Sequence, residues 1–136
     1  MKNVLILGAT SDIATALAHK FAEQGFELTL AARDAGRLAD TVSDLQIRHD
    51  TRAQAVEFDA LDFSGHAAFY DSLEPKPDVA ICVFGYLGDQ ATAQTDFAEA
   101  RQIIDTNYSG AVSVLNIIAN HFEQRRHGTI IGISSV

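Results

Sequence analysis

The chain has 136 residues, and its 18 acidic side chains outnumber its 10 lysines and arginines, which gives a formal net charge of -8 at pH 7. This length fits a single domain, residues 1–136, and the negative charge argues against a nucleic-acid partner or an anionic membrane surface. The one cysteine, Cys82, excludes an internal disulfide and fits a reducing compartment. Because no charged leader precedes an apolar stretch and no run of about 18 apolar residues occurs, we expect a soluble, cytoplasmic protein without a membrane span.

Apolar runs with the length of β-strands alternate with stretches of helical periodicity along the whole chain. We predict strands at 3–7, 27–32, 53–58, 78–84 and 129–134. Continuous apolar strands that alternate with helices form parallel sheets covered on both faces. The sequence therefore predicts a doubly wound α/β fold, the three-layer α/β/α Rossmann arrangement with strand order 3-2-1-4-5.

The predicted helices follow from apolar residues spaced three or four apart. The first runs from Ile13 to Gln24, and Gly25 stands where a helix C-terminal glycine belongs. The others are expected at Leu38–Leu45, Phe69–Leu73, 93–105 and 107–126.

The turn Gly8–Ala14 joins the first predicted strand directly to the first helix. A strand that leads into a helix through small residues presents backbone N–H groups and the positive end of the helix dipole to an anion. We therefore expect this turn to hold a phosphate, most readily that of a dinucleotide. The residues expected to contact it are Gly8, Thr10, Ser11, Asp12 and Ile13.

Asp12 is an unusual residue for such a turn, because it stands where a dinucleotide fingerprint has its second glycine. Like charges about 6 Å apart at an effective dielectric near 20 repel by roughly 3 kcal/mol. Either the Asp12 side chain turns outward or caps helix amides, or it weakens cofactor binding. We favour capping, a common role for aspartate at a helix start.

The end of the second predicted strand lies by topology beside the adenosine ribose of a bound dinucleotide. Enzymes that use NAD carry a carboxylate there, whereas this chain has Ala32 followed by Arg33. A guanidinium binds a 2′-phosphate with bidentate geometry. We therefore predict NADP as the cofactor, with NAD less favoured; alternatively, Arg33 is a solvated charge paired with Asp34.

Four segments in register resemble the short-chain dehydrogenases and reductases. The turn Gly8–Ala14 resembles that family's Thr-Gly-x-x-x-Gly-x-Gly motif, and Asp59, followed by Ala60, resembles its adenine-contacting aspartate. Asn107 is similar to the family's helix asparagine. The final segment, 128–136, resembles the fifth strand and places the catalytic serine at Ser135.

The fourth predicted strand departs from this family. Cys82–Gly85 stands where the family has Asn-Asn-Ala-Gly. Gly85 is the only residue of that motif present here, and we include it among the expected cofactor-binding residues. Apolar replacements here need not abolish binding, although Phe84 would narrow the adenosine side of the groove.

The resemblance implies hydride transfer between a nicotinamide and a small-molecule carbonyl or secondary alcohol. In that scheme Ser135 bonds the substrate oxygen and Asn107 supports the proton relay. The turn Gly8–Ala14 together with the later segment Leu87–Gln90 also resembles a bacterial branch that includes sugar-modifying keto-reductases, which implies a sugar keto group as one substrate class. The alternative is a non-catalytic NAD(P)-binding sensor or regulatory domain, since a fold alone establishes no chemistry.

The family's Tyr-x-x-x-Lys pair is missing, because none of Tyr70, Tyr86 and Tyr108 has a lysine four residues later. Residues 129–133 would also form an unprotected apolar edge strand, which native proteins usually avoid. We therefore expect a C-terminally incomplete fold, the cofactor-binding part of a longer enzyme, with negligible turnover by itself.

The remaining features allow two interpretations each. The helix at 107–126 resembles the family's dimer helix and predicts a homo-oligomer, although the sheet alone could cover its apolar stripe of Val112, Leu115 and Ile118. The segment Tyr86–Gln90 either touches substrate or is an ordinary loop, and Ser134 should face away from Ser135. The five histidines are scattered along the sequence, so we expect no metal site.

Overall fold

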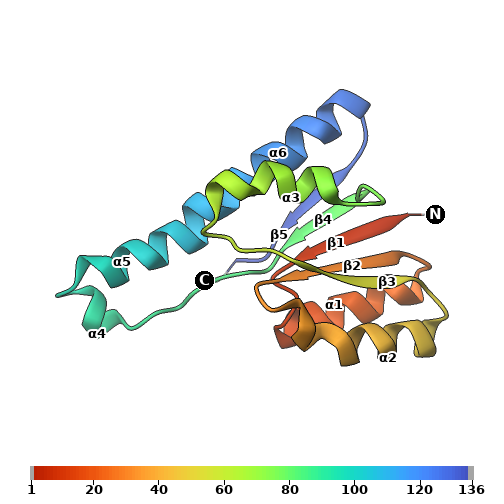
Figure 1. Ribbon diagram of the computed structural model, residues 1–136, viewed down its shortest axis with the longest axis horizontal. Coiled ribbons are helices and arrows are strands. Elements are labelled where there is room, and N and C mark those ends of the chain that lie inside the picture. Colours follow the sequence, from red (N-terminus) through yellow and green to blue (C-terminus); the bar gives the residue numbers. More distant parts are fainter. Residues whose placement is uncertain (1, 135–136) are drawn as a thin grey trace.

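The computed structural model describes residues 2–134, which form alternating strands and helices from end to end (Figure 1). All five predicted strands agree with the structure to within two residues at each end. The elements are β1 (Asn3–Leu7), α1 (Asp12–Glu23), β2 (Glu27–Ala32), the 3-10 turn η1 (Ala35–Leu38), α2 (Ala39–His49), β3 (Ala53–Glu57), the 3-10 turn η2 (Phe63–Gly65), α3 (His66–Ser72), β4 (Val79–Cys82), α4 (Gln90–Ala93), α5 (Phe97–Ile104), the π-helical turn η3 (Asp105–Ser109), α6 (Gly110–Arg125) and β5 (Thr129–Gly132).

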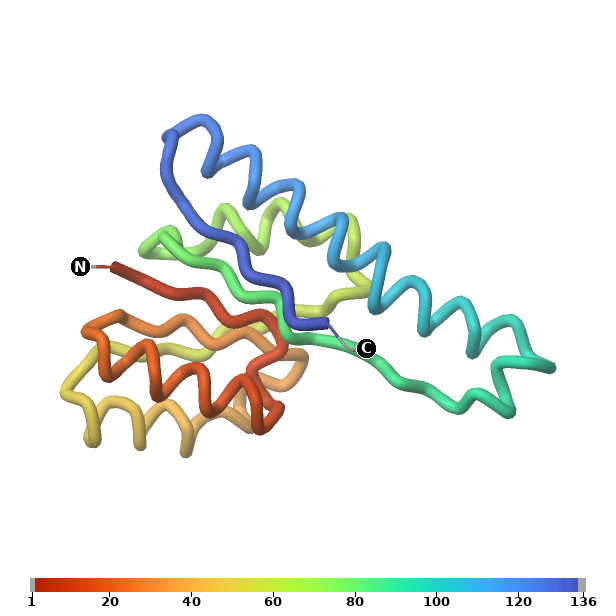
Figure 2. The backbone as a smooth tube through the Cα atoms, turned by 180° about the vertical axis from the view of Figure 1, so that it is seen from behind, coloured from red at the N-terminus to blue at the C-terminus, as the bar shows by residue number. Residues whose placement is uncertain are grey.

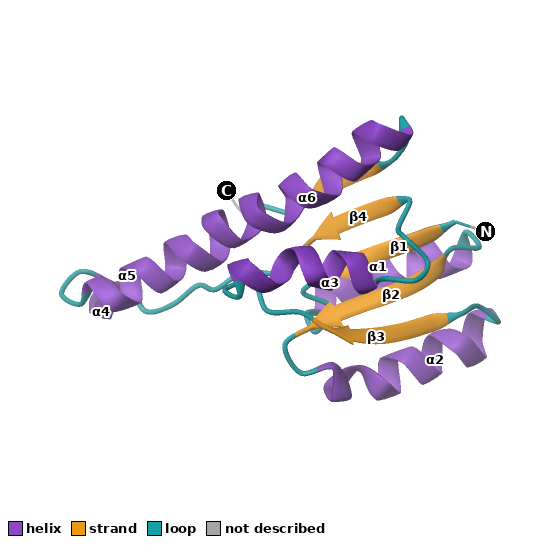
Figure 3. Cartoon of the chain, turned by 45° about the horizontal axis from the view of Figure 1, so that its top comes forward, coloured by secondary structure: helices purple, strands orange, loops and turns teal. Residues whose placement is uncertain are grey.

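The five strands form one parallel sheet in the order β3-β2-β1-β4-β5, so the predicted doubly wound fold is confirmed. Helices α1 and α2 cover one face, and α3 and α6 cover the other (Figures 1 and 3). Strands β2 and β3 are added on one side of β1, and β4 and β5 on the other, so the order of the sheet changes direction between β1 and β4, which pair directly. Parallel sheets of this kind bind ligands beyond the carboxyl ends of the strands at that switch point.

The central strand β1 is completely buried because helices cover both of its faces. Val4 and Ile6 pack with the alanines of α1, whereas Leu5 and Leu7 pack on the side of α6. This division follows from the period of two along a strand. Three alanines, Ala14, Ala18 and Ala22, are the buried residues of α1, so its backbone can approach the sheet closely.

The long helical segment after β4 differs from the sequence prediction. We predicted separate helices at 93–105 and 107–126, but α5 and α6 are joined through η3 into one helix that extends beyond the sheet (Figures 2 and 3). The buried residues along α6 are Gly110, Val114, Ile118 and Phe122, spaced four apart. The predicted stripe was therefore partly wrong, since Val112 is 43% exposed. Among residues 2–134, no helix combines the length and the apolar composition needed to span a membrane.

Gly8 lies against the backbone of the chain that leaves β4. Gly8 has φ of 93°, and a Cβ added there would lie 2.5 Å from the backbone nitrogen of Phe84. Gly25 has a similar φ of 83° but no atom within 4 Å of an added Cβ. A side chain at either position would strain the backbone, but only at Gly8 would it also collide with neighbouring atoms.

We predict that Gly8→Ala lowers the free energy of unfolding by about 3 kcal/mol or more, because the methyl group meets backbone that cannot yield. Gly25→Ala should cost only about 1–2 kcal/mol, the penalty of the left-handed conformation. Urea denaturation of both variants measures the difference. Equal losses of stability would show that the contact with Phe84 is not a constraint.

Candidate functional site

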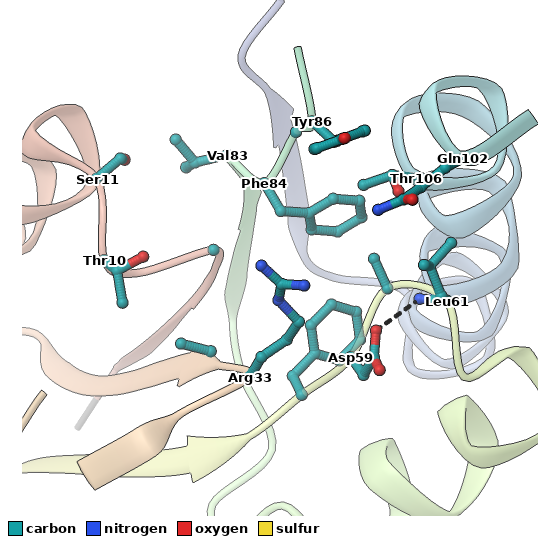
Figure 4. A pocket seen from close by; sticks show the side chains of 15 residues that line it. Thr10, Ser11, Arg33, Asp59, Leu61, Val83, Phe84, Tyr86, Gln102 and Thr106 are labelled. Carbon is teal, nitrogen blue, oxygen red and sulfur yellow. Dashed lines mark hydrogen bonds between the residues drawn. The ribbon is translucent and has the colours of Figure 1, made fainter. Parts of the chain in front are cut away.

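The carboxyl ends of β1, β2, β3 and β4 surround a pocket of about 200 Å³ (Figure 4). It lies beyond the edge of the sheet formed by the carboxyl ends of the strands, at the switch point between β1 and β4. The predicted site residues that line it are Gly8, Thr10, Ser11, Arg33, Asp59, Ala60 and Gly85. Asp12 and Ile13 lie next to this lining without forming part of it, and Ser135 lies outside the described residues.

The turn after β1 offers an anion the first amides of α1. The N–H groups of Gly8 and Ala9 both donate to the carbonyl of Ala31, at 2.9 and 3.0 Å, so the sheet already uses them. Within residues 2–134, no protein acceptor bonds the N–H groups of Asp12 and Ile13. Unpaired amides in the first turn of a helix, together with its dipole, favour a negatively charged group.

The cap of α1 corrects our expectation for Asp12. Ser11 is the N-cap residue, and its hydroxyl oxygen accepts a hydrogen bond of 3.1 Å from the N–H of Ala14. Ser11 has the extended backbone that aims an N-cap side chain at the third helical amide, whereas Asp12 already has helical geometry. The predicted capping by Asp12 is therefore wrong. Its carboxylate is exposed, which corresponds to the outward-turned alternative.

Arg33 follows β2 and directs its guanidinium into the middle of the pocket, between Thr10 and Phe84 (Figure 4). In the described part of the chain, no carboxylate lies within 4.0 Å of it, so a pair with Asp34 is not formed. Ala32, which precedes it, is only 6% exposed. The pocket therefore contains a cation whose charge no described side chain neutralises.

Asp59 lies in the loop after β3, at the opposite wall of the pocket. One of its carboxylate oxygens accepts a hydrogen bond of 2.9 Å from the N–H of Leu61 (Figure 4), and its carbonyl accepts one of 3.1 Å from Asp62. These bonds close a tight turn that holds the carboxylate at the edge of the pocket. The second carboxylate oxygen has no hydrogen-bond donor among the described residues.

Asn107 lies in the π-helical turn η3 and fixes the chain that leaves β4. Its side-chain oxygen accepts from the N–H of Tyr86 at 2.8 Å, and its side-chain nitrogen donates to the carbonyl of Tyr86 at 2.8 Å. A Cβ added at Gly85 would lie 3.0 Å from this same oxygen. The amide of Asn107 thus holds one rim of the pocket, and π-helical turns frequently occur at such sites.

Glu99 on α5 holds the chain after β4 at two further points. The hydroxyl of Tyr86 donates to Glu99 at 2.7 Å, and the N–H of Asp89 donates to the same oxygen at 3.0 Å. The hydrogen bond to Glu99, followed by burial and the charge of that carboxylate, raises the pKa of Tyr86 above its ordinary value. The segment after β4 is therefore held against the helix rather than free.

The pocket lining also includes residues that the sequence analysis did not assign to the cofactor. Phe84 was expected to narrow the groove, and its ring does lie in the pocket, 5.5 Å from the ring of Phe58. Gln102 and Thr106 were not predicted, although their spacing of four residues on one helix face just before Asn107 was a usable signal. The remaining lining residues are Ala32, Phe58, Leu61, Val83 and Tyr86.

The histidines are less scattered in space than in sequence. The Nδ1 atom of His19 lies 2.9 Å from the Nε2 atom of His49, between α1 and α2. Within residues 2–134, no three side chains of His, Cys, Asp or Glu gather closely enough to hold a metal ion. Burial raises the pKa of the Cys82 thiol to about 11, so this thiol stays protonated at neutral pH.

Comparison with known proteins places the chain in a family. The family model described as short chain dehydrogenase matches residues 2–136. The chain belongs to the short chain dehydrogenase family.

An uncharacterised oxidoreductase of Mycobacterium tuberculosis is 38% identical over 136 residues, which cover 98% of this chain and 54% of that protein. The chain thus spans about half the length of this curated relative. The structure of a short-chain dehydrogenase from Sphingobium yanoikuyae in complex with NADPH has a TM-score of 0.88 and 25% identity, over 100% of this chain and 54% of that one. An NAD+-bound xylitol dehydrogenase, with a TM-score of 0.89 and 22% identity over 98% of this chain and 53% of its own, shares the fold.

The contact between Tyr86 and Glu99 generates a pH prediction. Ionised Tyr86 would face the Glu99 carboxylate, so the raised pKa delays its ionisation to higher pH. Glu99→Gln removes that charge, and we expect the pKa of Tyr86 to fall toward its ordinary value. An ultraviolet difference titration against Tyr86→Phe isolates this tyrosine from the other two. The exposed Glu123→Gln on α6 is the matched control, and an equal fall there would contradict the assignment.

Proposed function

We propose that the pocket binds a nicotinamide dinucleotide, preferably NADP, and that the protein acts as an NADP-dependent short-chain oxidoreductase. The observation that carries this proposal is the unpaired Arg33 guanidinium inside a pocket bordered by the first turn of α1. The family assignment supports an oxidoreductase, and the start of α1, Arg33 and Asp59 each suit one chemical part of the cofactor. The proposed domain is the single cofactor-binding unit of residues 1–136.

The two anionic groups of NADP correspond to two separate features of the pocket. The open amides at the start of α1 suit the pyrophosphate, because they supply partial positive charge without a basic side chain. Arg33 suits the 2′-phosphate, since a guanidinium binds phosphate oxygens in pairs. Known structures with this fold include both an NADPH complex and an NAD+ complex, so the fold alone does not select the cofactor. Arg33, together with the apolar Ala32, favours NADP.

When bound, the nicotinamide would supply a hydride for a carbonyl substrate or accept one from a secondary alcohol. Ser135 is the proposed partner of the substrate oxygen, and a sugar keto group is one substrate class that we propose. Asn107 is proposed to act on the proton relay through the position in which it holds the chain at Tyr86. The Asp59 carboxylate, with one oxygen open, is the proposed acceptor for the adenine amino group.

We predict that NADPH binds more tightly than NADH and that Arg33→Ala removes most of this difference. A charge-assisted hydrogen bond contributes about 1.5–3 kcal/mol, so the loss in NADPH affinity should be roughly 10- to 100-fold, with NADH affinity little changed. Isothermal titration calorimetry at low salt measures both constants.

Arg52→Ala is the matched control for Arg33→Ala, because it removes the same charge from an 89% exposed side chain before β3, away from the pocket lining. It should leave the preference for NADPH unchanged. Equal affinities of the unmodified chain for NADPH and NADH would refute the assigned role of Arg33, and binding of neither would refute the cofactor site itself.

For the 136-residue chain alone we predict cofactor binding with negligible turnover. Its three tyrosines have no lysine four residues later, so the proton donor that the family uses is not supplied. NADPH oxidation followed at 340 nm with a panel of small ketones and keto sugars tests this. Steady oxidation would overturn the prediction, whereas turnover by a longer form carrying Tyr-x-x-x-Lys would separate the enzyme from a non-catalytic sensor.

A further inference from the structure

A buried histidine connects the adenine side of the pocket to helix α6. His66, at the start of α3, is 1% exposed, and both of its ring nitrogens are bonded. Its Nε2 atom lies 2.8 Å from the carbonyl oxygen of Asp59, and its Nδ1 atom lies 2.7 Å from the hydroxyl oxygen of Ser113. Because a carbonyl only accepts, Nε2 carries a proton and donates, so in the neutral ring Nδ1 accepts from the Ser113 hydroxyl.

The same loop meets α6 at a second point. A Cβ added at Gly110 would lie 2.6 Å from the carbonyl oxygen of Ala60, so the loop backbone rests directly on the helix. Gly110 and Ser113 are three residues apart and therefore share one face of α6. The His66 ring also stacks on Phe58, with centroids 5.2 Å apart and an angle of 23° between the rings. The loop after β3 is thus held by direct contact and by the histidine bridge.

The bridge bears on recognition because Phe58, Asp59 and Ala60 all line the pocket. The carboxylate of Asp59 is oriented by a turn whose carbonyl His66 holds. A change in the position of that carbonyl moves the carboxylate relative to a bound base.

We propose that His66 and Ser113 are positioning residues that set the contact between the Asp59 carboxylate and the adenine ring, and with it the selectivity for adenine. This inference rests on the proposed cofactor site. Adenine presents a 6-amino donor to a carboxylate acceptor, whereas hypoxanthine presents a carbonyl oxygen at that position, which a carboxylate repels. A site whose acceptor hydrogen-bonds a donor group of the ligand discriminates strongly against an analogue that lacks this group, provided that the acceptor is held in place.

The chain offers a matched control for the bridge. The hydroxyl of Tyr70 and the Nδ1 atom of His121 are also 2.7 Å apart, and they also join α3 to α6. Neither residue lines the pocket or bonds the loop after β3. Ser113→Ala and Tyr70→Phe therefore each remove one hydroxyl from the same helix pair, and only the first loosens His66.

The experiment measures the affinity of each variant for NADPH and for its hypoxanthine analogue. We expect Ser113→Ala to weaken NADPH binding about fivefold, the effect of one hydrogen bond, while the hypoxanthine analogue loses little, so that the ratio of the two affinities falls. Tyr70→Phe should leave both affinities and their ratio unchanged. Thermal unfolding of both variants shows whether their losses of stability are comparable.

A second pair of variants keeps the test decisive if Ser113→Ala does not fold. Ser113→Thr and Ser113→Val have nearly the same shape and differ in the hydroxyl group. We expect the threonine variant to retain the wild-type selectivity and the valine variant to lose it.

The outcomes distinguish the inference from the proposed function. If the unaltered chain binds neither ligand, the cofactor site is wrong. If it binds NADPH selectively, but Ser113→Ala behaves like Tyr70→Phe, or Ser113→Val like Ser113→Thr, then His66 has a purely structural role and the inference is overturned.

Discussion

The attachment of one long helix to two loops is the constraint on which the pocket depends. The helix formed by α5, η3 and α6 bonds the chain after β4 through Asn107, which both donates to and accepts from the backbone of Tyr86. It also supports the loop after β3 through Gly110 and through the bridge from Ser113 to His66. These contacts set the distance between two walls of the pocket. Backbone groups held by buried or paired side chains form a more precise site than free loops would.

The opposite wall depends on close packing rather than on side-chain bonds. Gly8 brings β1 against the end of β4 at a distance that excludes any Cβ, and its N–H and that of Ala9 are occupied by Ala31. In the proposed function, anion binding therefore depends on the next amides, at the start of α1, and on Arg33. The proposed phosphate site is compatible with the formal net charge of -8, since its positive potential would come from a helix end and one guanidinium.

Much of the fold and part of the site could be predicted from the sequence, because the signals were local. The apolar runs located the strands, and the alternation of strands and helices led to the confirmed strand order. The glycine turn and Arg33 were found because each stands directly after a strand, where ligands gather. The predicted cap at Asp12 was wrong, because the residue with the backbone angles of an N-cap is Ser11, one position earlier. The π-helical turn η3, which joins α5 to α6, was not predicted, because such a turn has no distinct apolar period.

The sequence by itself determined where the strands and most helices lie and that a glycine turn follows the first strand, since each of these depends on neighbours within a few positions along the chain. Only the tertiary structure decided which atoms the candidate site residues use. The bond of Asn107 to Tyr86 spans 21 positions, and that of His66 to Ser113 spans 47. Such contacts arise when separate helices and strands pack together, and no periodicity along the chain records which side chains will then meet.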